Sequence, residues 1–371
     1  MKRDPSHQNP HAATLEIASK KAAYEAFTRS VMSSSYLRKL ESNNRTHRHL
    51  FRFFLNIFIF STLIATFRYA VHLHISLALL YPAYLYFQGL TIAGFMIHAH
   101  ELSHNHIKNK PLNDFLGNLS GYFSFVNFYS FQHAHKFHHK NIGNIDSPEA
   151  GAPVSLRGQA KLRFDDKLYK AMVRLYAVSK HLLFVVSWPA FVIFGDYSSW
   201  LLPFRHKSGK IDRRSLVSFA LFCALNVVAI LSFARDYLLL FLPAVIIGGN
   251  RVLAITQMHH AHEDAIFFNE ENHNYFNTIM STTDRDFGPI VNFFMLNNGY
   301  HIPHHINPKI AYYDLEKASE YLRSTIPAHL SYNYYPDSHF SRALLENFYE
   351  RRLDSNPEFY QIKFDAPVKF P

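Results

Sequence analysis

The chain has 371 residues, of which 48% are hydrophobic and 16% aromatic, and its formal net charge is +10. Its single cysteine, Cys223, lies in an apolar run, which excludes a disulfide, a thiolate zinc site and an iron–sulfur cluster built from this chain alone. The basic residues flank apolar runs and form no separate module, so we expect an anionic membrane face, not nucleic acid, as their partner.

The first half of the chain predicts a membrane hairpin behind a polar start. Residues 1–49 are polar and basic, carry no signal-peptide pattern, and predict an N-terminal tail with an amphipathic helix around residues 12–27. Two apolar runs follow at residues 51–67 and 75–97, joined by a short link. Each approaches the roughly 20 residues that cross a bilayer, so the two runs predict a helical hairpin.

The middle of the chain is less regular. Residues 112–131 are apolar but broken by Asn, Asp and Gly, and predict an interfacial or partly buried segment. Residues 182–204 are apolar and aromatic with interrupting prolines, and predict a bent interfacial segment. The runs 216–233 and 237–255 are separated by only three residues and predict a second membrane hairpin.

We therefore expect an all-α integral membrane protein. It would have about four transmembrane helices in two hairpins, together with interfacial helices. A cytosolic cap would carry the clusters of histidines described in the next paragraph. Residues 50–325 would form the membrane domain and residues 326–371 a C-terminal cytosolic extension. Lys and Arg concentrate on the large-loop side, which the positive-inside rule places in the cytosol of a bacterial inner membrane or endoplasmic reticulum protein.

Histidine is the unusual residue of this chain. Fourteen of the 25 histidines lie in the windows 98–106, 133–139, 259–262 and 301–305. Helix positions i, i+3 and i+4 share a face, so His135, His138 and His139 are expected to aim at one point. His100 and His104 have the same i, i+4 spacing.

A second H-x-x-H-H pattern stands at residues 301–305 and contains Pro303. Proline suits the first turn of a helix. We predict that His301 precedes a helix whose first turn holds His304 and His305.

These clusters predict a metal site, because imidazole binds iron, copper, nickel and zinc. Together with His260 they supply about nine ring nitrogens, more than one tetrahedral or octahedral ion needs, so two ions are expected. The predicted ligands are His100, His104, His135, His138, His139, His260, His301, His304 and His305.

Several acids stand near these histidines in the sequence. Metal-bound histidines usually donate their second N–H to a carboxylate or carbonyl, so these acids are candidates for orienting the ligands. The alternative is that they are solvated loop acids. The candidates are Glu101, Asp146, Glu263, Asp264 and Asp284.

His100-Glu101-Leu102-Ser103-His104 also matches H-E-x-x-H, the zinc metalloprotease signature, in which Glu101 would be the general base. A membrane protease is thus an alternative from a different class. It would leave both H-x-x-H-H patterns without a role.

Three histidine boxes follow one another in the chain, at residues 100–104, 135–139 and 301–305. Their order resembles the membrane fatty acid desaturase family over roughly residues 50–325. Residues 299–310, which include the third box and Asn307-Pro308-Lys309-Ile310, are similar to its acyl-lipid, oleate-type branch, as are residues 283–288. Residues 260–264 resemble the additional histidine segment of this family. The third box begins with histidine, and no fused cytochrome b5 haem motif is present, which argues against the front-end desaturases.

The resemblance implies a di-iron centre, Fe2+/Fe3+, that activates O2 and leaves a cis double bond in an acyl chain. It also implies a fatty acyl lipid or acyl thioester as substrate and an external electron donor, a ferredoxin or cytochrome b5. A hydroxylase or ketolase of the same superfamily, acting on another lipid, stays open. Some relatives place an asparagine near the metal, for which Asn250 and Asn298 are the candidates.

Overall fold

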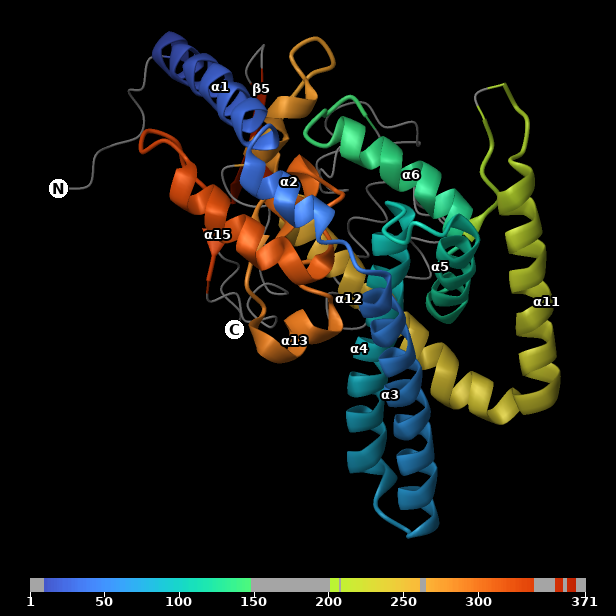
Figure 1. Cartoon of the computed structure of the whole chain (residues 1–371). Coiled ribbons are helices and arrows are strands. Elements are labelled where there is room, and N and C mark those ends of the chain that lie inside the picture. Colours follow the sequence, from blue (N-terminus) through green and yellow to red (C-terminus); the bar gives the residue numbers. More distant parts are fainter. Residues whose placement is uncertain are drawn as a thin grey trace.

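The structure is a computed structural model, and it describes residues 10–147, 201–206, 208–260, 265–336, 351–355 and 359–364. Most of these residues are helical, and the long helices extend from one side of a more compact body (Figure 1). Residues 182–200, the larger part of the predicted bent segment, lie outside the described residues.

The first predicted hairpin is present as two long helices, α3 (Thr46–His72) and α4 (Leu77–Ser103), which lie side by side (Figure 1). Each has 27 residues, which corresponds to a length of about 40 Å at the rise of an α-helix. The link between the two helices is residues 73–76. The apolar runs predicted a longer link at residues 68–74, because α3 continues beyond the first run.

The second predicted hairpin is one helical run with a bend. It consists of α11 (Arg213–Asp236), a π-helical turn η2 (Tyr237–Phe241) and α12 (Leu242–His260). Phe233 leaves the helical region with φ −140° and ψ 36°, and the chain changes direction there. Its position agrees with the end of the first predicted run.

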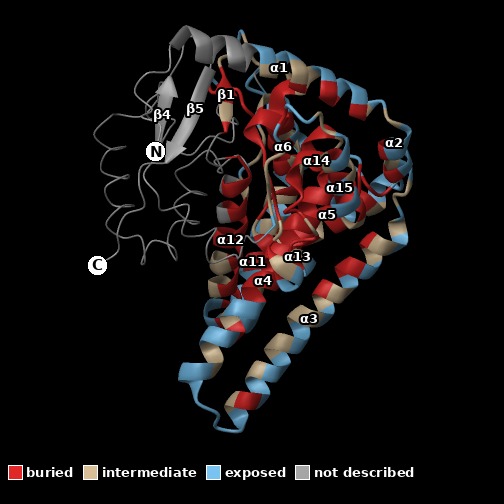
Figure 2. Ribbon diagram, turned by 90° about the vertical axis from the view of Figure 1, so that its left-hand side faces the viewer, coloured by how far each residue is buried: buried red, intermediate tan, exposed pale blue. Residues whose placement is uncertain are grey.

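Among the described residues, two helical stretches are long and apolar enough to cross a membrane: Thr46–His72 and the run Arg213–His260. Their outward faces are apolar, with Phe51 68%, Phe58 66% and Leu231 81% exposed. Figure 2 shows much of α3 and the far end of α4 as exposed. Apolar surface of this extent indicates a lipid or protein partner.

The α3–α4 pair and the run from α11 to α12 meet where α12 packs against α4. Gly89 and Gly248 make this approach close: a Cβ atom on Gly248 would lie 2.7 Å from the carbonyl oxygen of Gly89. The crossing brings the C-terminal ends of α4 and α12, and so His100 and His260, to the same side of the molecule.

The N-terminal segment packs against the compact body. α1 (Pro10–Met32) and α2 (Ser35–Ser42) bury Tyr24, Phe27 and Leu37 in a cluster that also contains Ile302. The region predicted as a polar tail thus shares its apolar face with the third histidine box.

The expectation of an all-α chain was incomplete, because short strands are present. β5 (Phe359–Phe364) pairs antiparallel with β1 (Ile266–Phe268) and with β4 (Arg351–Ser355). β2 (Asp284–Arg285) pairs in parallel with β3 (Tyr334–Tyr335). Strands of two to six residues are too short to show a clear alternation of apolar and polar residues, which is why the sequence did not reveal them.

Candidate metal centre

The first two histidines stand at the end of α4. His100 lies in the last turn of the helix, and His104 is the residue that caps it. Their i, i+4 spacing brings the two rings to a centroid distance of 5.4 Å. The prediction that these two imidazoles share one face agrees with this geometry.

α6 (Phe128–Asn141) carries the second box. The Asn127 side chain caps the helix by accepting the N–H of Ser130, and the helix then continues through all three histidines. The ring of His135 lies against those of His139 and His100, with centroid distances of 4.5 and 4.3 Å. His138 instead turns toward His260 and His305, with centroid distances of 5.0 and 5.2 Å.

The third box forms the short helix α14 (His301–Ile306). His301 is its first residue, so the prediction that His301 precedes the helix was wrong by one position. Pro303 occupies the first turn, where the missing N–H costs nothing because the first N–H groups of a helix have no internal partner. The preceding Gly299 accepts the N–H of Arg285 through its carbonyl, which joins α14 to β2.

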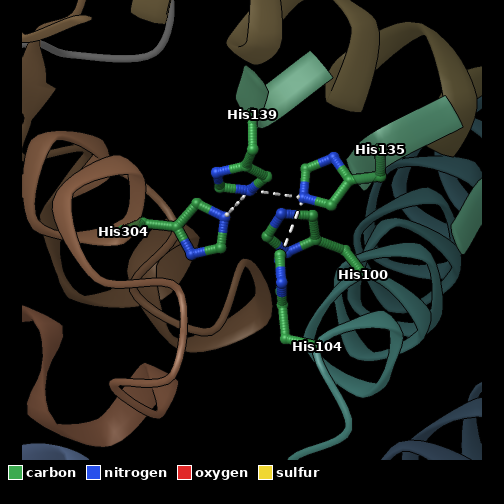
Figure 3. Close-up of side chains that lie close together, drawn as sticks. All are labelled: His100, His104, His135, His139 and His304. Atoms are coloured by element: carbon green, nitrogen blue, oxygen red, sulfur yellow. Dashed lines mark hydrogen bonds between the residues drawn. The ribbon is translucent and has the colours of Figure 1, made fainter. Parts of the chain in front are cut away.

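All nine predicted ligands come together, in two groups within each of which the ring nitrogens lie within 4.8 Å of one another. Figure 3 shows the first group, in which rings from three helices face a common point. The first group is His100, His104, His135, His139 and His304, and the second is His138, His260, His301 and His305. The expectation that one H-x-x-H-H pattern serves one point was therefore wrong.

The spacing of the ring nitrogens fits the binding of metal ions. The Nε2 atom of His139 lies 2.9 Å from that of His135 and 3.1 Å from that of His304. Two nitrogens at right angles around an ion, each at about 2.1 Å, are about 3.0 Å apart, whereas tetrahedral geometry gives about 3.4 Å. Both observed spacings are short enough for the three rings to share one ion.

Several ring nitrogens have no other partner. Nε2 of His100 and Nδ1 of His304 are buried without a hydrogen bond among the described residues. Buried polar atoms rarely stay unpaired. A cation among them would satisfy lone pairs that the protein does not.

The protonation state also favours cation binding. Burial, followed by repulsion from neighbouring imidazoles, holds the pKa well below its usual 6.5 for six of these histidines. Neutral imidazole is the form that binds metal. The six are His104, His135, His139, His301, His304 and His305.

Among the described residues, Glu101 is an acid that lies beside the first group. Its Oε1 lies 3.7 Å from Nδ1 of His100, and its Oε2 accepts the N–H of Tyr312 at 2.9 Å. The carboxylate is buried and also lies 3.9 Å from Nε2 of His106. These contacts hold both carboxylate oxygens against protein groups, whereas a general base would face water. Tyr312 could not be predicted as its partner, because 211 residues separate them in the sequence.

Asp284 supports the second group through α14. It is buried and accepts three hydrogen bonds: from the N–H of Ile302, from Ser319 Oγ and from the Tyr332 hydroxyl, at 2.6, 2.5 and 2.6 Å. Burial raises its pKa to about 6, against the opposing effect of these donors. Ser319 and Tyr332 had no sequence signal.

The other predicted acids receive less support. Asp146 is exposed, and its carboxylate accepts the N–H of Glu270, a position that does not support a role beside the ions. Glu263 and Asp264 lie outside the described residues. Of the two asparagine candidates, Asn298 is buried with no described hydrogen-bond partner for Oδ1.

The remaining clustered histidines have other contacts. His98 bonds to Ser120, and His106 lies between the Asn44 side chain and the Pro308 carbonyl. His133 stacks on Phe204 at 4.1 Å. His259 stacks on His301, also at 4.1 Å, so of the two adjacent histidines only His260 enters the second group. His262 lies outside the described residues.

The chain is mostly helical and has two apolar stretches of membrane-spanning length. Its two adjacent groups of imidazoles place it among the helical proteins that could hold two metal ions through histidine. The chain belongs to the fatty acid desaturase family, whose sequence profile matches residues 76–336. The predicted family, and with it membership of the oxidoreductases, is confirmed.

Three curated proteins illustrate what the chain is similar to. An sn-1 acyl-lipid omega-3 desaturase (ferredoxin) of Nostoc sp. (strain 36) is 25% identical over 300 residues, covering 74% of this chain and 75% of the relative. An endoplasmic reticulum acyl-lipid omega-3 desaturase (cytochrome b5) of Arabidopsis thaliana is 24% identical over 296 residues, covering 78% and 75%. A Delta(12) acyl-lipid conjugase (11E,13E-forming) of Impatiens balsamina is 23% identical over 278 residues, covering 71% and 70%.

Proposed function

We propose that the chain is a membrane di-iron acyl desaturase, which uses O2 and an external electron donor to introduce a cis double bond into a fatty acyl chain. The observation that carries this proposal is the convergence of nine imidazoles into two adjacent groups. The acyl-lipid desaturases among the relatives support a lipid-borne acyl chain as substrate.

The donor set fits two iron ions. One group offers five imidazoles and the other four, and within each group the ring nitrogens lie within 4.8 Å of one another. Iron bound there would supply the activation of O2 that an unreactive alkyl C–H bond requires. Glu101 beside His100, and Asp284, which accepts the N–H of Ile302 in α14, would align the imidazoles.

The surroundings of the site suit an apolar substrate. Side chains of α4, α12 and the helix α13 (Gly288–Phe294) form one buried apolar cluster, which includes Met96, Met258 and Phe294. Met96 is four residues before His100 and Met258 two residues before His260. Apolar walls beside the histidines exclude water from the reacting carbons and accept a methylene chain without leaving polar groups unpaired.

The same hydrogen abstraction can end in hydroxylation, so a hydroxylase or ketolase is the runner-up. The zinc protease is disfavoured, because Glu101 is engaged by Tyr312 and His100 and because nine imidazoles exceed the needs of one zinc ion.

We also propose four membrane crossings, by α3, α4, α11 and α12, with the histidines in the cytosol of a bacterial inner membrane or endoplasmic reticulum protein. The 27-residue length of α4 and the bend at Phe233 support two hairpins. Tags at the N-terminus, in loop 205–214 and at the C-terminus should then all be accessible from the cytosol. Accessibility from opposite sides at any two would contradict this topology.

The reaction is tested by expressing the chain in a host of simple lipid composition together with a ferredoxin or cytochrome b5 system. Gas chromatography–mass spectrometry of the fatty acids should show a new unsaturated species that disappears in the His304→Ala variant. A hydroxylated product would favour the runner-up. Absence of any oxidised lipid, in iron-loaded protein with an active donor, would contradict both.

A further inference from the structure

One of the nine site histidines is less completely buried than the others. His104, at the C-terminal cap of α4, is partly exposed, whereas the other eight are buried. Its Nε2 lies 3.0 Å from Nε2 of His135, and its ring lies 4.9 Å from that of His304. His104 is therefore the least covered residue of the first group.

A basic stripe on α6 begins beside this ring. The side chain of Gln132 donates to the carbonyl of Ser103, the residue before His104, at 2.9 Å. Lys136 and Lys140 follow at intervals of four residues, so they continue along the same face of the helix, and both are exposed. Phe137, 44% exposed, adds an apolar side chain between them.

The two lysines have no assigned task within the chain. In the part of the chain that the structure describes, neither forms an ion pair. Each directly follows a histidine of the first group, His135 or His139, which points inward. The same two turns of helix thus connect an exposed cationic face to the buried imidazoles.

The proposed reaction needs electrons from outside. Converting –CH2–CH2– to –CH=CH– releases two electrons and two protons, whereas reducing O2 to two waters takes four of each. Two electrons must come from a carrier, in two one-electron encounters that oxidise it, and two protons must come from water. Because electron transfer slows steeply with distance, the carrier must approach the site where the histidines are least covered.

We propose that the stripe formed by Gln132, Lys136, Phe137 and Lys140 is the docking surface of the external electron donor, a small one-electron carrier with an acidic face. The donor would lie over His104, so that electrons enter through the five-histidine group and not the four-histidine group. This inference rests on the proposed function and adds the place of electron entry to it.

The competing partner of these cations is an anionic lipid surface. Cations that serve headgroups are expected at the ends of membrane helices, as with Arg213 and Arg214 at the start of α11. α6 is not part of either stretch of membrane-spanning character. A few charges around one aromatic ring also suit the small, transient complexes of electron-transfer proteins.

The test measures binding separately from turnover. The full chain is placed in nanodiscs of phosphatidylcholine, metal-free and iron-loaded, and titrated with oxidised ferredoxin and with oxidised cytochrome b5. The variants are Lys136→Gln with Lys140→Gln, and the corresponding double change to Glu. The matched control reverses Lys39 and Lys309, which are exposed on α2 and after α14.

We expect the Kd of the carrier to be higher in the double Gln variant than in the wild type, and higher still in the double Glu variant. The total rise should be roughly ten- to a hundredfold, mostly through a slower association rate. The effect should shrink as salt screens the charges, and the control should bind like wild type. The KM for the carrier should rise in parallel, while the iron content stays that of wild type.

An unchanged Kd in the double Glu variant, or an equal loss in the control, would overturn the docking surface. So would the failure of both carriers to bind the wild type. Failure of the proposed function looks different: carrier binding would depend on Lys136 and Lys140, yet no oxidised lipid would form with any donor.

Discussion

His138 and His139 are neighbours in the sequence but belong to different histidine groups. Adjacent residues of an α-helix point about 100° apart, whereas residues four apart differ by only about 40°. Accordingly His135 joins His139, and His301 joins His305, while the third histidine of each pattern turns to the other group. The spacing predicted which residues take part. Their division depends on how the four helices α4, α6, α12 and α14 meet, and the spacing of residues along one helix does not contain this information.

At the residue scale, Glu101→Gln tests whether this carboxylate orients His100. The amide still accepts the Tyr312 N–H but loses the charge beside the ring, so iron affinity should fall by roughly ten- to a hundredfold. Iron content at limiting iron measures this. Asp146→Asn, which removes the charge of an exposed acid, should leave iron binding unchanged. Equal iron affinity in Glu101→Gln and wild type would exclude the orienting role.

Gly299→Ala tests the contact that fixes the start of the third box. A Cβ atom there would lie 2.1 Å from the carbonyl oxygen of Arg285, so the strand and α14 must move apart. We expect a protein that folds but retains little iron in its second group. Gly209→Ala has open space around it and should cost only the strain of its positive φ, roughly 1 kcal/mol. Iron content and thermal unfolding distinguish the two.

At the element scale, α14 shows what sequence can and cannot supply. Pro303 in the first turn and the i, i+4 histidines predicted a helix here, and a helix is present. A six-residue helix is too short to be stable alone, however, and its support comes from distant residues. Asp284 was a candidate from the sequence, but its donors Ser319 and Tyr332 became visible only in the fold.

Asp284→Ala should therefore destabilise the protein strongly. It removes the acceptor of three hydrogen bonds, each worth about 1 kcal/mol, so we expect a loss of about 3 kcal/mol. Ser319→Ala removes one donor and should cost about 1 kcal/mol. Thermal unfolding of the metal-free proteins measures both. Similar stabilities for the two variants would show that Asp284 is not the support of α14.

At the scale of the whole molecule, the long apolar helices were the most predictable feature, because periodicity and length suffice to recognise them. The short strands and the packing of α1 against the third box were not predictable, since both depend on contacts between residues far apart in the sequence. The histidine groups were predictable only in part. The sequence showed which histidines cluster, but their division into two groups became visible only in the fold.

The buried histidines predict instability in acid for the whole molecule. Their pKa values are lowered in the folded state, so below pH 6.5 the unfolded chain binds more protons, and the free energy of unfolding falls as the pH falls. Asp284, with its pKa raised to about 6, acts in the opposite direction but is a single group. The metal-free protein should unfold at a clearly lower temperature at pH 5.5 than at pH 7.5. Equal temperatures would contradict the buried, neutral state of the histidines.

The most direct test of the central claim is the metal content of the purified, iron-supplemented protein, measured by elemental analysis for wild type, His304→Ala and His260→Ala. Two histidine groups predict two iron ions per chain in the wild type, and loss of iron in each variant, which removes one imidazole from a different group. A single zinc ion per chain, unaffected by either substitution, would contradict the di-iron site and restore the protease alternative.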